Sequence, residues 1–295
     1  MSSLERYSNK NNKNIDIYEK IIVIWKNIPL FIKLFLITTF IFYIMNLLTK
    51  NISFFLSNIP YYTISYFQIW RLITTIFIST HLFKIILGLI CWVKYASSLE
   101  SSIGTVKYMT IFFLNTLFIQ IIYCILKYSI KYLFKKDNNY LIYKNSLRGI
   151  NNNSLWGNII CELTLLCISN PESPNKLLLI PVVIKAKYYP FLLLGIFTIA
   201  NSFIIDLEVL SGLLYAYIYF YYLKNILKIS DDFAQKLEDN IIFNNLTNFN
   251  SFVSISNVNN GNTFSVMNVS VNQIRMENDM EYINNKNDEE YKNLK

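Results

Sequence analysis

Two ionisable side chains stand in stretches of the chain that are otherwise apolar. Lys84 lies near the middle of the run Leu72–Val93, and Glu162 lies in the shorter run Ser154–Ile168. A charged side chain at the centre of a bilayer costs about 3 kcal/mol or more, so it needs a partner, a wet cavity or a function. An ion pair between Lys84 and Glu162 would lower that cost, and such pairs either mark ion paths or lock helix bundles. A small ion or metabolite carrier is therefore one hypothesis.

The chain lacks the patterns that peptide-bond hydrolysis inside a membrane requires. A serine protease needs a serine in a tight Gly-x-Ser-Gly turn and a histidine that takes its proton. The closest two of the seven glycines are eight residues apart, and His81 is the single histidine. His-Glu-x-x-His is absent, and Asp206 is the only aspartate near an apolar run. We predict a protein that is not an enzyme and that uses no metal or cofactor.

Composition indicates that lipid is the main solvent of this chain. The 295 residues are 53% hydrophobic and 16% charged, whereas a soluble domain carries about 25% charged residues. The basic excess behind the net charge of +8 flanks apolar runs and forms no aromatic–basic pattern for nucleic acid. The four cysteines lie in apolar runs without a CxxC pair, which is typical of small buried side chains and not of zinc ligands.

Six apolar runs approach the roughly 20 residues with which a helix crosses a bilayer, and the fourth is short. We expect an all-α polytopic membrane domain over residues 30–229, with a Lys/Asn-rich insert at about 127–153. Residues 1–29 form a basic N-terminal segment without a cleavable signal peptide, and the first run acts as a signal anchor. The runs are Leu30–Leu48, Leu72–Val93, Tyr108–Leu126, Ser154–Ile168, Tyr188–Ile205 and Leu207–Ile226.

The charges beside these runs predict an orientation. Six basic residues precede or begin the first run, which places the N-terminus in the cytosol, and six spans return the C-terminus there. The basic insert then falls on the lumenal side, against the same trend. Residues 230–295 carry five basic and ten acidic residues and little apolar density, so we expect a disordered cytosolic tail. A short docking helix within Leu237–Phe252 is the alternative.

The stretch from Tyr66 to Tyr123 resembles the rhomboid-like superfamily. It holds Trp70-Arg71 before the second run and Glu100 in the turn after it, at the spacing of rhomboid proteases. The following Gly104-Thr-Val-Lys-Tyr is similar to rhomboids and to the pseudoproteases with a ubiquitin-associated domain. The preceding Gln68–Thr74 fits derlins equally well.

The stretch from Asn170 to Tyr222 extends the resemblance, which covers roughly 160 of the 295 residues. Lys185-Ala-Lys-Tyr-Tyr-Pro190 is similar to the derlin pattern before span five. Gly212 and Ala216 match the small-x-x-x-small helix of span six, a spacing that lets two helix backbones approach closely. In the superfamily register the oxyanion positions hold Lys84 and Gly88, and Tyr217 stands at the histidine position. The resemblance therefore implies a six-helix rhomboid-like bundle that is a pseudoprotease.

The resemblance also implies roles for particular residues. Tyr66, Phe67, Trp70 and Arg71 belong to a loop that perturbs lipid and admits substrate, although simple interfacial anchoring is the alternative. Glu100 is implied as a structural turn, and Gly212 and Ala216 form the helix-packing motif. The polar residues of the spans are assigned to a lateral cavity for unfolded segments. They are Lys84, Glu162, Asn115, Gln120 and Asn201.

The resemblance implies a derlin-like protein of the endoplasmic reticulum membrane. It would bind misfolded or membrane proteins and help to move them to the cytosol for degradation. A membrane ubiquitin ligase and a cytosolic unfoldase ATPase would be its partners, in homo- or hetero-oligomers. The alternative is a trafficking or scaffold protein of the early secretory pathway, which is favoured because the tail lacks the derlin ATPase motif and a ubiquitin-associated domain.

Overall fold

The computed structural model of the chain describes residues 22, 25–49, 51–79, 82–133, 154–172, 174–176, 183–201, 203–227 and 229–258. His81 and most of the insert at 127–153 lie outside these residues. The described part is mostly helical, as the sequence predicts. It also holds a two-stranded antiparallel sheet of β1, Pro174–Lys176, and β2, Val183–Lys185.

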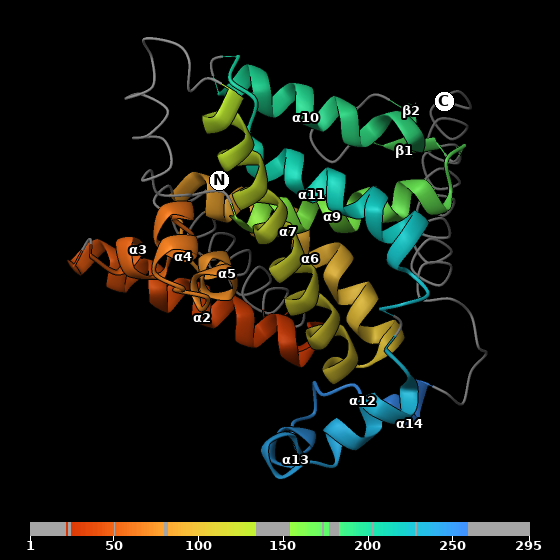
Figure 1. Ribbon diagram of the computed structural model, residues 1–295. Coiled ribbons are helices and arrows are strands. Elements are labelled where there is room, and N and C mark those ends of the chain that lie inside the picture. The colour runs from red at the N-terminus through yellow and green to blue at the C-terminus, as the bar shows by residue number, and fades with distance from the viewer. Residues whose placement is uncertain are drawn as a thin grey trace, which may run out of the picture.

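Six apolar helices of 12 residues or more make up the main body of the described chain (Figure 1). Two stretches, Leu30–Thr49 and Thr105–Ile130, are long and apolar enough to cross a membrane, and the other helices hold shorter apolar stretches. The number of spans therefore stays a prediction. The six helices are α2 (Leu30–Thr49), α6 (Leu82–Ile103), α7 (Thr105–Leu133), α9 (Ser154–Ser169), α10 (Tyr189–Ala200) and α11 (Leu207–Ile218).

Short helical segments join the longer ones. Before α10 stands η3, Ala186–Tyr188, and after α11 follows a π-helical turn, η4, Tyr219–Leu223. The loop between α2 and α6 folds into four short segments. They are α3 (Asn51–Leu56), α4 (Pro60–Ser65), α5 (Arg71–Thr74) and the 3₁₀ turn η1 (Thr75–Phe77).

The second apolar run is not one helix, and the expected span Leu72–Val93 is wrong at its start. After η1 the chain is extended at Ile78, and α6 begins only at Leu82. The hydroxyl of Thr74 donates to the carbonyl of Leu56 at 2.8 Å, so this segment is tied to the preceding loop. Helix α6 ends at Gly104, whose φ of +90° is the left-handed conformation with which a glycine commonly ends a helix.

Helix α9 is the centre of the bundle. Every residue from Leu155 to Cys167 is buried, and α9 packs along α11 with α10 beside both (Figure 1). Aromatic side chains fill the space between α2, α6 and α7. Trp92 lies 4.7 Å from Phe35 and 5.3 Å from Phe112, measured between ring centroids. Burial on all sides explains why the fourth run is mostly apolar around the whole helix although it is short.

The expectation of a disordered tail from residue 230 is wrong for residues 231–258. They form α12 (Asp231–Glu238), α13 (Ile241–Thr247) and α14 (Ile255–Val258), which lie together beneath the ends of α6 and α7 (Figure 1). We call residues 231–258 the tail cap. Backbone bonds fix it to the bundle, because Leu30 donates to Ser251 at 2.9 Å and Thr105 donates to Val253 at 2.8 Å.

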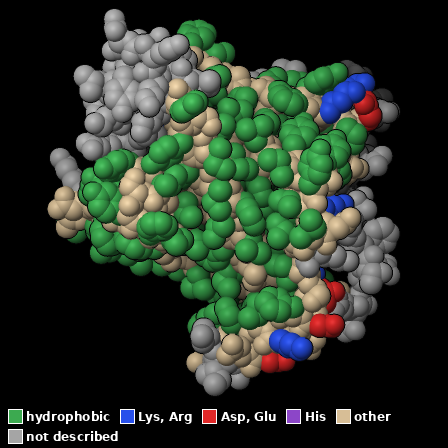
Figure 2. All heavy atoms as spheres, in the orientation of Figure 1, with side chains coloured by type: hydrophobic (Ala, Val, Ile, Leu, Met, Phe, Trp, Pro, Cys, Tyr) green, Lys and Arg blue, Asp and Glu red, His purple; other side chains and the backbone are tan. Residues whose placement is uncertain are grey.

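The surface of the described chain separates apolar from charged side chains. Figure 2 shows apolar side chains over most of the visible face, with charged ones gathered at its edge near β1–β2 and over the tail cap. Those charges include Glu172, which pairs with Lys185 at 2.9 Å and with Lys187 at 2.7 Å. Large side chains such as Ile90 (66% exposed) and Leu48 (79%) face outward. A broad apolar surface of this kind matches lipid as its surroundings.

Candidate functional site

Arg71 organises the loop between α2 and α6 from inside. Its side chain is 2% exposed. The guanidinium donates from Nε to Gln68 Oε1 at 2.6 Å, and from Nη1 to the carbonyls of Phe54 (2.5 Å) and Ser57 (2.8 Å). The ring of Tyr62 lies 5.5 Å from its central carbon. The sequence analysis assigned Arg71 to the lipid-perturbing loop, and the structure shows its side chain buried inside that loop, where it holds the segments together.

The other three residues assigned to this loop do project from it. Tyr66 is 60% exposed, Phe67 79% and Trp70 43%. Phe67 has a φ of +53°, a left-handed conformation that costs a non-glycine residue about 1–3 kcal/mol. The backbone is therefore held in a strained turn whose side chain points away from the protein. A large apolar side chain presented on a rigid base suits insertion into lipid.

Glu100 lies buried near the end of α6, not in a turn after it as the resemblance had implied, and it joins three segments. Its carboxylate accepts the amide of Phe31 at 2.9 Å, the amide of Ile32 at 3.2 Å and the hydroxyl of Thr105 at 2.8 Å. The two amides belong to the first turn of α2, so Glu100 caps that helix from α6. Thr105 also accepts the amide of Val253 at 3.0 Å, which links the tail cap to the same site.

The environment of Glu100 shifts its titration. Glu100 lies beyond the apolar stretch Lys84–Val93 of α6. Burial raises the pKa of Glu100 to about 7, against the lowering effect of the hydrogen bonds from Phe31, Thr105 and Ile32. Loss of hydration destabilises the charged carboxylate more than these hydrogen bonds stabilise it. The folded state therefore favours the protonated acid.

Gly212 stands at the closest approach of two helices. A Cβ built on Gly212 would overlap the backbone of Gly157 at well under 3.0 Å. Ala216, one turn later, is fully buried beside Cys161 of α9. The small-x-x-x-small motif therefore packs α11 against α9, and Gly157, which the sequence analysis did not single out, is its partner.

Glu162 and Lys84 lie in different surroundings. The carboxylate of Glu162 accepts the indole N–H of Trp92 at 3.2 Å and the hydroxyl of Tyr108 at 2.9 Å. Lys84 lines a small cavity with Thr39 and lies two helical turns before Trp92, about 12 Å along α6. Within the described residues Glu162 forms its bonds to α6 and α7, and no ion pair with Lys84 is among them. The carrier hypothesis depends on an ion pair between Lys84 and Glu162, and the described residues do not support it.

The remaining polar residues bond in separate places instead of lining one cavity. Asn115 accepts the hydroxyl of Tyr215 at 3.0 Å. The amide of Asn201 donates to Asp206 at 3.2 Å, and Asp206 caps the start of α11. Each amide has a partner, which is the usual condition of buried polar groups.

Gln120 belongs to a buried chain of hydrogen bonds that connects three elements. Its carbonyl accepts the amide of Asn58 at 2.7 Å, and its own amide donates to Glu208 on α11. The hydroxyl of Thr63 in turn donates to Asn58 at 2.7 Å. Asn58 and Glu208 were missed on the sequence, because Asn58 stands in a loop and Glu208 follows the helix start, where acidic residues are common.

The positions that would hold protease groups in the superfamily register carry none here. Gly88 packs against Trp156, whose ring carbon would lie 3.4 Å from a Cβ at that position. Tyr217 stacks on Tyr221 with ring centroids 6.3 Å apart. Within the described residues, no group of three or more His, Cys, Asp or Glu is placed to hold a metal ion. His81 lies outside the described part.

Comparison with known proteins gives a family and nothing finer. No curated protein and no solved structure matches the chain. A family model described as eukaryotic integral membrane protein (DUF1751) matches residues 33–254. This match covers most of the bundle and reaches into the tail cap. It confirms the membrane class, which is the coarser part of the rhomboid-like resemblance, and it names no derlin. The chain belongs to this family of eukaryotic integral membrane proteins.

Proposed function

We propose that this chain is a non-catalytic, rhomboid-like protein of the endoplasmic reticulum membrane, with both termini in the cytosol. It binds misfolded or membrane proteins and assists their retrotranslocation for degradation. The observation that carries the proposal is the loop before α6, in which a buried Arg71 holds three exposed aromatic side chains. A protein that must admit other chains from lipid needs such a rigid, membrane-inserting element.

The short helices support the same function. Helix α10, whose side chains Phe191 and Ile199 are exposed, has 12 residues, which is about 18 Å of helix, whereas the hydrocarbon core of a bilayer is about 30 Å thick. A short span thins the bilayer around it. A thin bilayer beside the aromatic loop lowers the barrier for moving polar segments of a client protein. A membrane ubiquitin ligase and a cytosolic unfoldase ATPase would then complete extraction.

The loop variant that removes Tyr66, Phe67 and Trp70 together, each replaced by serine, tests this proposal in cells. The control is Tyr222→Ser, which removes an aromatic side chain that is 75% exposed elsewhere. Pulse–chase measurement of a misfolded lumenal reporter should show slower turnover with the loop variant and normal turnover with the control. Equal turnover in both strains, at equal protein levels, contradicts the proposal.

The proposed lack of catalysis has its own test. Purified full-length protein is mixed with a transmembrane model peptide in vesicles, and the products are read by mass spectrometry. We expect the peptide to stay intact. Cleavage that survives purification and disappears when one serine of this chain is replaced by alanine overturns the pseudoprotease assignment.

A second candidate, a trafficking scaffold of the early secretory pathway, is favoured by the tail cap. Residues 231–258 are folded onto the bundle and not free, and the family match extends to residue 254. Affinity purification with mass spectrometry separates the candidates. Ubiquitin ligase and unfoldase among the bound proteins support the degradation role, whereas coat or tether proteins without them support the scaffold.

A further inference from the structure

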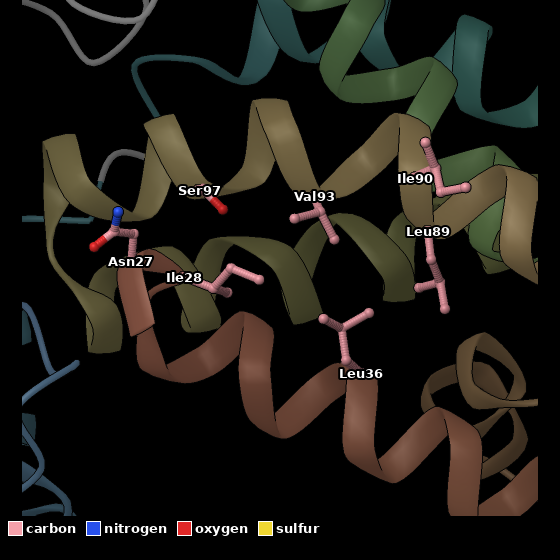
Figure 3. A pocket seen from close by; sticks show the side chains of 7 residues that line it. All are labelled: Asn27, Ile28, Leu36, Leu89, Ile90, Val93 and Ser97. Atoms are coloured by element: carbon pink, nitrogen blue, oxygen red, sulfur yellow. The ribbon is translucent and has the colours of Figure 1, made fainter. Parts of the chain in front are cut away.

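A groove runs between α2 and α6 along the outer face of the bundle. It is largely open to the surroundings and offers about 560 Å³, which lies within the range of about 300–1,000 Å³ that ligand pockets occupy. Figure 3 shows Leu89 and Val93 of α6 facing Leu36 of α2, whereas Ile90 points away from α2. Five apolar side chains line most of the groove. They are Ile28, Leu36, Leu89, Ile90 and Val93.

One end of the groove is polar. Asn27 and Ser97 line it there (Figure 3). The hydroxyl oxygen of Ser97 is buried and has no hydrogen-bond partner within the described part of the chain. A buried hydroxyl without a partner is unfavourable, so a ligand oxygen that accepts a hydrogen bond from it fits this position. The unsatisfied group therefore points to an occupant with an oxygen acceptor at this end and hydrocarbon beyond it.

Positive charge lies beside the same end. Lys26 is exposed and adjacent to Asn27, and the amine of Lys33 donates to the carbonyl of Lys26 at 3.2 Å. Glu100 lies near this end, where it is buried and already bound to the first turn of α2. Among the described residues, Lys26 and Lys33 therefore supply outward-facing positive charge here, which attracts an anionic headgroup.

We propose that the α2–α6 groove binds one acyl chain of an anionic phospholipid from the surrounding leaflet. The hydrocarbon lies along Leu36, Leu89 and Val93. A carbonyl oxygen of the lipid ester accepts a hydrogen bond from the hydroxyl of Ser97. The headgroup phosphate lies between Lys26 and Lys33. The family places this chain in a membrane, so lipid is the medium that meets the groove.

The dimensions favour one lipid chain over a protein helix. From Leu89 to Ser97 the groove follows eight residues of α6, about 12 Å. A docked helix would gain contacts over little more than two helical turns at that length. A lipid chain also needs no polar partners along its length, which agrees with the apolar walls.

Native mass spectrometry of the full-length protein tests the proposal. The protein is purified in mild detergent and mixed with phosphatidylserine or phosphatidylcholine. The wild type should retain one phosphatidylserine through delipidation. Val93→Trp, and separately Leu36→Trp on the opposite wall, should lower the retained fraction about tenfold. Ile86→Trp is the matched control, because Ile86 is exposed on α6 outside the lining.

A second pair of variants tests the role of the positive charge at the polar end of the groove. Lys26→Ala should remove the preference for phosphatidylserine, whereas Lys224→Ala, at another exposed lysine, should leave it unchanged. Equal retention by Val93→Trp, Leu36→Trp and the wild type, all shown to be folded by gel filtration, overturns the proposal. So does a wild type that retains phosphatidylcholine equally well, retains no lipid, or carries a bound peptide instead. These outcomes do not depend on the cellular role proposed above.

Discussion

Two helix pairs of this bundle meet in opposite ways. Helices α9 and α11 touch through the backbones of Gly157 and Gly212, which leaves no room for a single added carbon. Helices α2 and α6 diverge instead and leave a groove of about 560 Å³ between large apolar side chains. Both pairs are apolar, so hydrophobicity alone does not decide which contact is tight. The difference lies in side-chain size at the crossing, which makes one pair a fixed seam and leaves the other open to a ligand.

The largest effect is expected from adding atoms at the seam. Gly212→Val places a Cβ inside the backbone of Gly157, and neither backbone can retreat without separating α9 from α11. We expect a loss of more than about 4 kcal/mol, or no folded protein. Thermal unfolding in detergent measures this. Gly195→Val on α10 is the control, since nothing lies within 4 Å of a Cβ there. Similar losses of stability at both positions would contradict the close contact of α9 and α11 at Gly212.

A smaller loss of stability is expected at one end of the α2–α6 pair, where Glu100 of α6 accepts two backbone amides of α2. We call this set of hydrogen bonds the clamp. Glu100→Ala leaves the amides of Phe31 and Ile32 buried without their acceptor. We expect a loss of about 2–3 kcal/mol in the free energy of unfolding, measured by urea titration in detergent. Glu172→Ala removes an exposed carboxylate whose ion pairs are screened by water, so it should leave stability nearly unchanged. A Glu100→Ala variant as stable as the wild type would show that the pair needs no clamp.

The same clamp predicts a dependence on pH. The pKa of Glu100 rises from 4.5 to about 7 in the folded protein because of burial. The folded state then binds more protons than the unfolded state between these values. The stability that Glu100 contributes is full below about pH 4.5 and is lost as pH rises through 7. Comparing the wild type with Glu100→Gln over this range isolates the effect, and parallel stability curves would refute it.

The smallest effect is expected from adding atoms in the groove. Val93→Phe fills part of the space between α2 and α6, so we expect a change within about 1 kcal/mol of zero. Val209→Phe adds the same atoms at a fully buried position of α11 and should cost several times more, because overpacking displaces neighbours. Thermal unfolding of both variants decides the comparison. Equal losses would mean that the groove is as closed as the seam.

Several residues could be found from the sequence because their type limits their role. The rhomboid-like resemblance pointed to Glu100, and the spacing of Gly212 and Ala216 on one helix face predicted a close helix contact. The burial of Arg71 could not be predicted, because its sequence neighbours are aromatic. Its partners, the carbonyls of Phe54 and Ser57, are backbone groups that no sequence pattern marks.

The polar residues of the spans show a second limit. Lys84, Glu162 and Gln120 were assigned to one cavity because all three interrupt apolar runs. Helix rotation and axial position decide whether such residues meet, and these quantities depend on how neighbouring helices pack. In the structure Glu162 faces Trp92 and Tyr108, whereas Gln120 faces Asn58 and Glu208.

Apolar run length and charge distribution determined the membrane class and the order of the apolar helices, because a bilayer excludes unpaired charge and unbonded backbone. Tertiary structure alone decided three further features: the burial of Arg71, the docking of the tail cap onto Leu30 and Thr105, and the groove between α2 and α6. All three depend on distances between segments far apart in the chain. Local propensity and hydrophobic period carry no information about those distances, whereas packing of the whole bundle fixes them.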